Sequence, residues 1–259
     1  MKPVALTIAG SDPSGGAGIQ ADLKTFHQFG VYGMSVVTLL TVQNTQHLRR
    51  AKILEASFVL EQLDALLDDF SPNAAKTGAL GSAEIVEAVA ERAKHFRFPL
   101  VVDPVMVSKH GVRLMEPAAE VLLAQRLLPQ AALVTPNIQE AEVLSKRKIE
   151  DDASLLDAAK AILQLGVKAV LIKGGHRQDD ATDFLCTPEG VQQFAAARLE
   201  TPHTHGTGCT YSAAITAVLS QGKALADAVS TAKRYVTEAI ATAPKLGRGQ
   251  GPVNHHASF

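Results

Sequence analysis

Short runs rich in β-branched residues alternate along the chain with longer segments in which hydrophobic positions recur every three or four residues. The short runs have the length and composition of strands, and the longer segments have the periodicity of amphipathic helices. The expected strands are VALTIAG, SVVTLLTVQ, AAKTGAL, LVVDPVM, AALVTPN and AVLIKGG, and the expected helices cover residues 17–29, 58–69, 83–95, 117–127, 154–165, 210–220 and 225–241.

This alternation predicts βαβ units and a central, mostly parallel sheet. Several of the strands are almost continuously apolar, which indicates that both faces of the sheet are covered by helices. The segment ATDFLCTPEGVQQFAA departs from the pattern, because two short strands flank a Pro-Glu-Gly turn. Such a segment is typical of an antiparallel hairpin, here at one edge of the sheet. We therefore expect an α/β three-layer sandwich that forms one domain over residues 1–259.

Composition and charge exclude several classes of function. The 259 residues are 46% hydrophobic and carry a formal net charge of -1, without the clustered Lys and Arg that bind nucleic acid. No segment approaches the ~20 consecutive apolar residues that span a membrane. The two cysteines, Cys186 and Cys209, form no disulfide or metal-binding pattern, which favours a cytoplasmic location.

The segment HGTGCT directly precedes a predicted helix and is the first candidate for chemistry. Gly206, Thr207 and Gly208 allow backbone N–H groups to face an anion at the helix N-terminus. The alternative is an ordinary junction of loop and helix in which Thr207 is the N-cap. In the first turn the helix dipole favours the thiolate of Cys209, which could accept a proton from a substrate hydroxyl group, whereas we expect Cys186 to be a buried, inert thiol.

Polar residues at other predicted strand ends and helix starts complete the set of candidate functional residues. Asp22 either offers its carboxylate to a polar ligand or is a first-turn residue favoured by the helix dipole. Asn137 and Glu140, three residues apart, either hold Mg²⁺ or form a capping box. Lys173 is a candidate point charge for a phosphate chain, and Asp103 could orient a metal ion or a lysine. Together these groups indicate phosphoryl transfer.

A set of motifs in one collinear order extends this interpretation from Val4 to His256. The motifs are IAGSDPSGGAGIQADLKTF, TVQNT, AAKTGAL, VVDPVMVSKHG, TPNIQEAE, LIKGGH, THGTGCTYSAAI and GPVNHH. With these motifs the chain resembles the hydroxymethylpyrimidine/phosphomethylpyrimidine kinases of thiamine biosynthesis, a family of the ribokinase-like superfamily. The resemblance implies a ribokinase-like fold, a homodimer, and ATP- and Mg²⁺-dependent phosphorylation of 4-amino-5-hydroxymethyl-2-methylpyrimidine and then of its monophosphate.

The same resemblance implies roles for individual residues. Gly206, Thr207 and Gly208 would surround the transferring phosphoryl group. Cys209 stands where sugar kinases of the superfamily carry an aspartate base, and would face the hydroxymethyl group. The remaining implied positions are Gly10, Asp22, Gln43 and Val107 for the pyrimidine, Lys173 for the ATP phosphates, and Asn137 and Glu140 for Mg²⁺. To these we add Ala79 in the pyrimidine wall and Asp103 at the ATP site, where it could orient the metal ion or the lysine.

One departure from the family pattern bears on specificity. Many relatives have methionine where this chain has Ala79, which predicts weaker pyrimidine binding or tolerance of a larger pyrimidine or pyridine. His110 is a second departure, to which we assign no consequence. Pyridoxal kinase on the same fold is therefore the main alternative, although the amide of Gln43 favours an aminopyrimidine. A pyrimidine-binding protein without activity would need neither metal motif nor anion hole, and this chain has both. A sugar kinase is disfavoured because Cys209 stands in place of the aspartate base.

Overall fold

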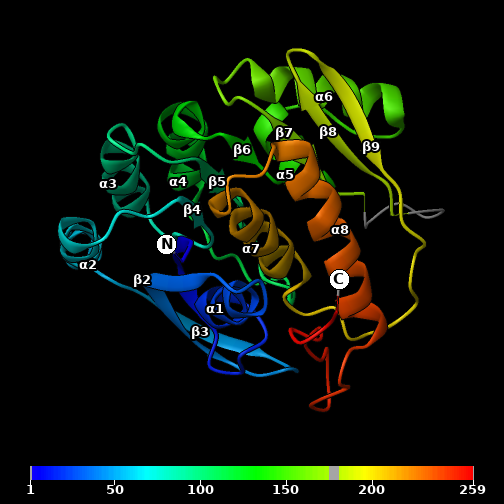
Figure 1. Cartoon of the computed structure of the whole chain (residues 1–259), viewed down its shortest axis with the longest axis horizontal. Coiled ribbons are helices and arrows are strands. Elements are labelled where there is room, and N and C mark those ends of the chain that lie inside the picture. The colour runs from blue at the N-terminus through cyan, green and yellow to red at the C-terminus, as the bar shows by residue number, and fades with distance from the viewer. Residues whose placement is uncertain (1, 175–180, 259) are drawn as a thin grey trace.

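A continuous sheet of nine strands crosses the centre of the molecule (Figure 1). The computed structural model describes residues 2–174 and 181–258. In spatial order the strands are β3 (Leu48–Ile53), β2 (Tyr32–Gln43), β1 (Val4–Ser11), β4 (Ala74–Thr77), β5 (Leu100–Val102), β6 (Leu133–Val134), β7 (Val170–Ile172), β8 (Asp183–Thr187) and β9 (Gly190–Phe194).

The strands from β2 to β7 in this order run parallel, and both edges of the sheet are antiparallel. The predicted hairpin is confirmed as β8 and β9, which pair from Asp183 with Phe194 to Thr187 with Gly190. The antiparallel strand β3 at the other edge was not predicted. Its sequence, LRRAKI, carries three cations and little hydrophobic alternation, because an edge strand faces water on several sides.

The helices agree with the hydrophobic periodicity to within a few residues, and the short α5 begins at the helix start indicated by Asn137 and Glu140. The predicted helix over residues 117–127 consists of a short α-helix and a π-helical turn. The helices are α1 (Gly18–Gln28), α2 (Ala56–Asp69), α3 (Ala83–Ala93), α4 (Pro117–Leu122), the π-helical turn η1 (Leu123–Leu127), the 3₁₀ turn η2 (Leu128–Gln130), α5 (Ile138–Ser145), α6 (Asp152–Leu163), α7 (Thr207–Ser220) and α8 (Leu225–Ala241).

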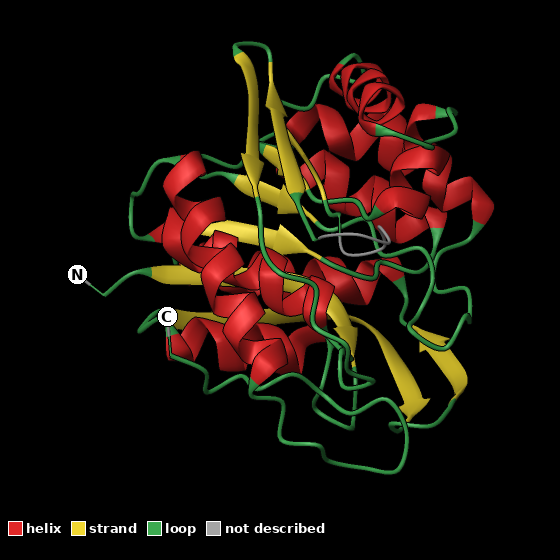
Figure 2. Cartoon of the chain, turned by 90° about the vertical axis from the view of Figure 1, so that its right-hand side faces the viewer, coloured by secondary structure: helices red, strands yellow, loops and turns green. Residues whose placement is uncertain are grey.

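Two hydrophobic clusters lie on opposite faces of the sheet and confirm the three-layer architecture. One cluster joins the sheet to α2 through α6, and the other joins it to α1, α7 and α8. In Figure 1, α7 lies between the sheet and the front of the molecule, with α1 and α8 beside it, and Figure 2 shows the same layer from the side. Because α7 is buried on nearly all sides, its sequence consists mostly of small and apolar residues and has no separate polar face.

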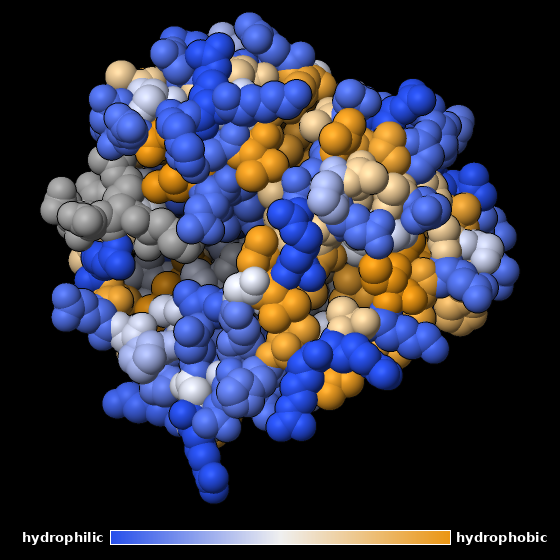
Figure 3. All heavy atoms as spheres, turned by 180° about the vertical axis from the view of Figure 1, so that it is seen from behind, coloured by the Kyte–Doolittle hydropathy of each residue, from blue (hydrophilic) through white to orange (hydrophobic). Residues whose placement is uncertain are grey.

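The outer surfaces carry the polar positions of the helices. Seen from behind, hydrophilic residues cover most of the molecule and hydrophobic side chains gather in strips between them (Figure 3). Among the described residues, no helix is long and apolar enough to cross a membrane.

Candidate active site

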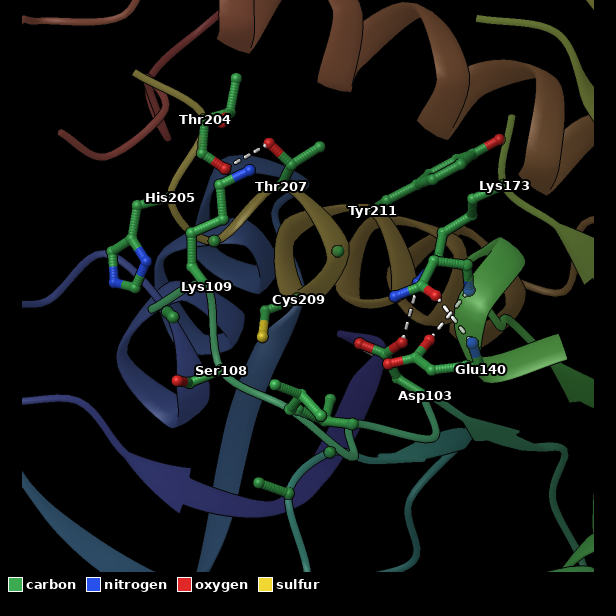
Figure 4. A pocket seen from close by; sticks show the side chains of 18 of the residues that line it. Asp103, Ser108, Lys109, Glu140, Lys173, Thr204, His205, Thr207, Cys209 and Tyr211 are labelled. Carbon is green, nitrogen blue, oxygen red and sulfur yellow. Dashed lines mark hydrogen bonds and ion pairs between the residues drawn. The ribbon is translucent and has the colours of Figure 1, made fainter. Parts of the chain in front are cut away.

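A cavity of about 880 Å³ opens at the carboxyl ends of the parallel strands, where open α/β sheets bind ligands. The ends of β1, β2, β4, β5 and β7 contribute to its wall, and the N-terminus of α7 enters it from one side. Figure 4 shows the side chains of Cys209, His205, Lys109, Asp103 and Lys173 around this space. The cavity therefore collects most of the residues that the sequence singled out.

The turn before α7 is built around Gly206, which is the N-cap of the helix with φ +80°. A Cβ atom at this position would lie 1.7 Å from the carbonyl oxygen of Gly16, so only glycine fits. The interpretation of Thr207 as the N-cap is wrong, because Thr207 is the first helical residue and its hydroxyl donates to Thr204 O at 2.8 Å. The helix starts three residues earlier than predicted, so Gly208 and Cys209 lie in its first turn, where N–H groups have no partner within a helix.

Lys173 and Asp103 form an ion pair beside this turn. Lys173 Nζ lies 3.0 Å from Asp103 Oδ1, and both side chains border the cavity. A Cβ atom on Gly208 would lie 3.5 Å from Lys173 Nζ, so the ammonium group is adjacent to the first turn of α7. Burial acts against both charges, but the charges of Lys173 and Lys76 lower the pKa of Asp103, and Asp103 and Glu140 raise the pKa of Lys173.

Asn137 and Glu140 form the capping box of α5. Glu140 N–H donates to Asn137 Oδ1 and Asn137 N–H donates to Glu140 Oε2, each at 2.9 Å. An isolated parallel β-bridge pairs the backbone of Asn137 with that of Lys173, which places the N-terminus of α5 beside the lysine. Burial raises the pKa of Glu140 to about 7, against the charge of Lys173.

The same residues suit a Mg²⁺ ion that keeps most of its waters. The described residues contain no group of three or more His, Cys, Asp or Glu side chains arranged as metal ligands. Mg²⁺ usually binds through one or two carboxylates, several waters and the phosphates of its nucleotide, and it does not require an all-protein cage. Glu140, which lines the cavity near Asp103, provides such a carboxylate.

Burial, more than the helix dipole, sets the chemical state of Cys209. Burial raises the pKa of Cys209 to about 12, and the charge of Lys76 only partly opposes this effect. At neutral pH the residue is therefore a thiol, although it lies in the first turn of a helix, where the dipole favours a thiolate. Cys186 lies buried in β8 as expected, and burial raises its pKa to about 11.

Asp12, His205 and Gln43 form a polar cluster at the other end of the cavity. His205 Nε2 lies 2.8 Å from Asp12 Oδ2 and 3.2 Å from Gln43 Nε2. A single ring nitrogen cannot both donate to Asp12 and accept from Gln43. Because a hydrogen bond to a carboxylate is the stronger of the two, the amide of Gln43 keeps donor capacity for a ligand.

Four of the five residues predicted to bind the pyrimidine line the cavity, namely Gly10, Gln43, Ala79 and Val107. Asp22 does not. Its side chain is fully buried and forms an ion pair with Lys76 at 2.8 Å, so neither carboxylate oxygen reaches the cavity. The carboxylate has this position because residue 22 faces the sheet, on the inner side of α1.

Comparison with known proteins identifies the family. A model of the phosphomethylpyrimidine kinase family matches residues 12–254. A hydroxymethylpyrimidine/phosphomethylpyrimidine kinase of Staphylococcus aureus (strain MSSA476) is 46% identical over 262 aligned residues, which cover 99% of this chain and 95% of the relative. The chain belongs to the phosphomethylpyrimidine kinase family.

Solved structures agree with this assignment and confirm the ribokinase-like fold. A phosphomethylpyrimidine kinase from Clostridium difficile has a TM-score of 0.82 at 43% identity, covering 92% of this chain and 100% of that one. A pyridoxal kinase from Staphylococcus aureus, in complex with AMP-PCP and pyridoxal, has a TM-score of 0.91 at 36% identity, covering 99% of this chain and 95% of that one. This kinase is thus a phosphotransferase whose structural relatives include enzymes for two vitamins.

Several cavity residues of this kinase were not predicted. Lys109 extends across the cavity on the side of Thr207 in Figure 4, and burial lowers its pKa. His205 and Asp12 meet only through the fold, 193 residues apart in sequence. The position of His205 directly before the GTGC turn was the one local signal. Gly175 and His176 of the LIKGGH motif lie outside the described residues.

Proposed function

We propose that this chain uses ATP to phosphorylate the hydroxymethyl group of 4-amino-5-hydroxymethyl-2-methylpyrimidine, and then the resulting monophosphate, in thiamine biosynthesis. The observation that carries the proposal is the position of the α7 N-terminus between two chemically different ends of one cavity. Lys173 and Asp103 lie at one end, and Gln43, Gly10 and Ala79 line the other. The family and the names of its relatives support the same reaction.

In the first transfer, the hydroxymethyl oxygen forms a bond to the γ-phosphorus of ATP while the bond from that phosphorus to the β,γ-bridging oxygen breaks. The N–H groups of the first turn of α7 and the ammonium group of Lys173 stabilise the charge on the moving phosphoryl group. The hydroxyl proton passes to an oxygen of the transferred phosphoryl group, and ADP leaves with the bridging oxygen. Because Cys209 is a thiol in the free enzyme, we assign it a hydrogen-bonding position at the acceptor oxygen rather than the role of a resting base.

Asn137 and Glu140 would hold Mg²⁺, through waters at least in part, and the ion would neutralise phosphate charge. Lys173 would contact the ATP phosphates, and Asp103 would orient the lysine through their ion pair, which lies beside Gly208.

The main alternative acceptor is pyridoxal. Two observations favour it: the small side chain of Ala79 in the cavity wall, and the close structural similarity to a pyridoxal kinase. The amide of Gln43 favours the pyrimidine, because it has donor capacity beyond its contact with His205 and can pair with ring nitrogens.

The test is ATP consumption in the presence of Mg²⁺ with each acceptor offered separately, with mono- and diphosphorylated products resolved. We expect the pyrimidine to give monophosphate and then diphosphate. Faster turnover of pyridoxal, with no diphosphate from the pyrimidine, would move the function to pyridoxal phosphorylation. Omission of Mg²⁺ should abolish both reactions.

We also propose that the protein is a cytoplasmic homodimer. The two cysteines, one in β8 and one in α7, are free, which suits a reducing compartment. Light scattering on the purified protein, coupled to size exclusion, tests the dimer, since a mass near 27.4 kDa would indicate a monomer.

A further inference from the structure

Residues 107–113 form a small flap at the acceptor end of the cavity. Val107 and Arg113 pair in an isolated antiparallel β-bridge, and Ser108 N–H donates to the carbonyl oxygen of Val112 at 2.8 Å. Most residues of the flap line the cavity. The flap is therefore a hairpin with a defined tip.

His110 holds the tip of this flap against two other segments. Its Nε2–H donates at 3.2 Å to the carbonyl oxygen of Asn44, in the turn between β2 and β3. Its ring also stacks on the ring of His205, with the ring centroids 6.1 Å apart and the planes 12° apart. Because Asn44 follows Gln43 and His205 precedes Gly206, the tip is fixed between the acceptor wall and the turn before α7.

Lys109, the neighbour of His110, is the cation that the flap brings to the cavity. Its side chain points into the cavity on the side of Thr204 and Thr207, and away from Asp103 (Figure 4). A lysine presents a compact positive charge with three donors. The ammonium group of Lys109 therefore serves a part of the cavity that the cation at the ATP end does not.

Lys109 differs from the other cavity lysines in having no counter-charge. In the described part of the chain three lysines line the cavity, and two of them are paired. Lys173 lies 3.0 Å from Asp103, and Lys233 lies 2.7 Å from Asp183. Lys109 forms no ion pair with a described carboxylate, and burial lowers its pKa without an opposing carboxylate. A cation that faces a ligand cavity without a partner indicates an anionic ligand.

A two-step kinase supplies such an anion at the acceptor end. The first acceptor is an uncharged hydroxymethyl group, whereas the second is a phosphate monoester with a charge of about -1.5 to -2 at pH 7. Asp12 adds negative charge there, because hydrogen bonds from His205 and Ser14 lower its pKa although burial acts against the charge. The second acceptor must therefore approach ATP and Asp12 against electrostatic repulsion, which a nearby cation offsets.

We propose that Lys109 binds the phosphate group of the second acceptor, and that His110 is the positioning residue that holds the flap over it. In the second transfer, a phosphate oxygen of the monoester forms a bond to the γ-phosphorus of ATP while the bond from that phosphorus to the β,γ-bridging oxygen breaks. The products are the diphosphate and ADP, and the dianionic monoester has no proton to lose. This inference rests on the two-step function proposed above.

The first test compares the two acceptors in the same variants. Lys109→Met keeps the approximate length of the side chain and removes its charge. At saturating ATP, we expect kcat/KM for the monophosphate to fall by roughly tenfold to a hundredfold, and kcat/KM for the alcohol to fall by less than about threefold. Lys109→Arg should stay close to the wild type with both acceptors. Lys94→Met is the matched control, because Lys94 pairs with Glu91 on the surface of α3.

Equal losses for the two acceptors, together with a raised KM for ATP, would place Lys109 on the ATP phosphates and overturn the proposal. Wild-type kinetics of Lys109→Met with the monophosphate would overturn it as well. Circular dichroism and a cooperative melt establish that each variant is folded.

His110→Ser separates the position of the flap from its charge. The substitution removes the contacts with Asn44 and His205 and leaves Lys109 in place. We expect KM for both acceptors to rise by the same factor, about threefold, with kcat little changed. A loss confined to the monophosphate would contradict the positioning role of His110.

A binding measurement separates this inference from the proposed function. Calorimetry without ATP compares the affinities of the monophosphate and the alcohol. We expect the wild-type preference for the monophosphate to weaken as NaCl rises from about 50 mM to about 300 mM, and Lys109→Met to reduce this preference about tenfold and remove most of its salt dependence.

Phosphorylation of pyridoxal and not of the pyrimidine by the wild-type protein would refute the proposed function. The same binding comparison would then use pyridoxal 5′-phosphate and pyridoxal, because Lys109 recognises the phosphate and not the ring. An unchanged preference for the phosphorylated ligand in Lys109→Met would refute the phosphate site in either case.

Discussion

Two Lys–Asp ion pairs flank the N-terminus of α7, and they differ in their access to the cavity. Lys76 and Asp22 are each 0% exposed, whereas the side chain of Lys173 is 14% exposed and that of its partner Asp103 is 2% exposed. Lys173 can therefore contact a ligand directly, and Lys76 cannot. The same two residue types thus serve two purposes on the two sides of one helix.

The difference follows from where each lysine lies on its strand. Lys173 comes one residue after the end of β7, where the chain leaves the sheet and side chains reach the ligand cavity. Lys76 lies within β4, between neighbouring strands and beneath α1 and α7, so its ammonium group must find its counter-charge inside the protein. Position relative to a strand end separates a ligand-binding cation from a structural one.

Loss of the sealed cation should have the largest effect on stability. Lys76→Met leaves the carboxylate of Asp22 buried without a counter-charge, with the hydroxyl group of Thr7 as its remaining partner, and we expect the free energy of unfolding to fall by about 3–5 kcal/mol. Lys173→Met should cost only about 1–2 kcal/mol, because Asp103 keeps hydrogen bonds from Thr135 and Ser212 and lies at the cavity. Urea denaturation of both variants measures the difference. Similar losses of unfolding free energy in the two variants would mean that the two ion pairs do not differ in their contribution to stability.

The open cation should instead dominate activity. Lys173→Met removes a positive charge next to the first turn of α7, and we expect kcat/KM for ATP to fall by roughly 10²–10³-fold. Lys160→Met is the matched control, since Lys160 pairs with Asp157 on an exposed helix surface. If Lys173→Met retained activity within a few-fold of the control, Lys173 would not contact the phosphates.

The sequence reveals the open pair and not the sealed one for a physical reason. Lys173 and Asp103 both follow apolar strands, and parallel strands bring their carboxyl ends to one edge of the sheet. Asp22 and Lys76 are 54 residues apart, and each has an ordinary local explanation, as a helix residue and as a strand residue. Only the packing of α1 on β1 and β4 brings them together.

Local rules likewise predicted the layers and the hairpin, but they did not determine the ionisation state of Cys209 and they missed one strand. The helix dipole favours a thiolate at Cys209, yet burial outweighs it, and burial is a property of the whole fold. The polar strand β3 escaped notice because an exposed edge needs no apolar pattern. Interactions within a few residues could thus be predicted, whereas those set by long-range packing could not.

The smallest expected effect concerns the wall at Ala79, which lies at the acceptor end near the sealed pair. Its carbonyl oxygen accepts a hydrogen bond from Thr38 Oγ1 at 2.6 Å, so the backbone is held and a longer side chain changes only the space in the cavity. Ala79→Met adds apolar surface against the ring, and we expect KM for the pyrimidine to fall roughly threefold to tenfold, with kcat little changed.

The same substitution should reduce turnover of pyridoxal, if the wild-type protein shows any, because the space available to the larger ring is filled. Steady-state kinetics with both acceptors, at saturating ATP, measure this exchange of specificity. Val143→Met, at an exposed position of the cavity rim on α5, is the control for added bulk. An unchanged KM for the pyrimidine in Ala79→Met would show that this wall does not contact the ring, and the acceptor would then be held mainly by Gln43 and its neighbours.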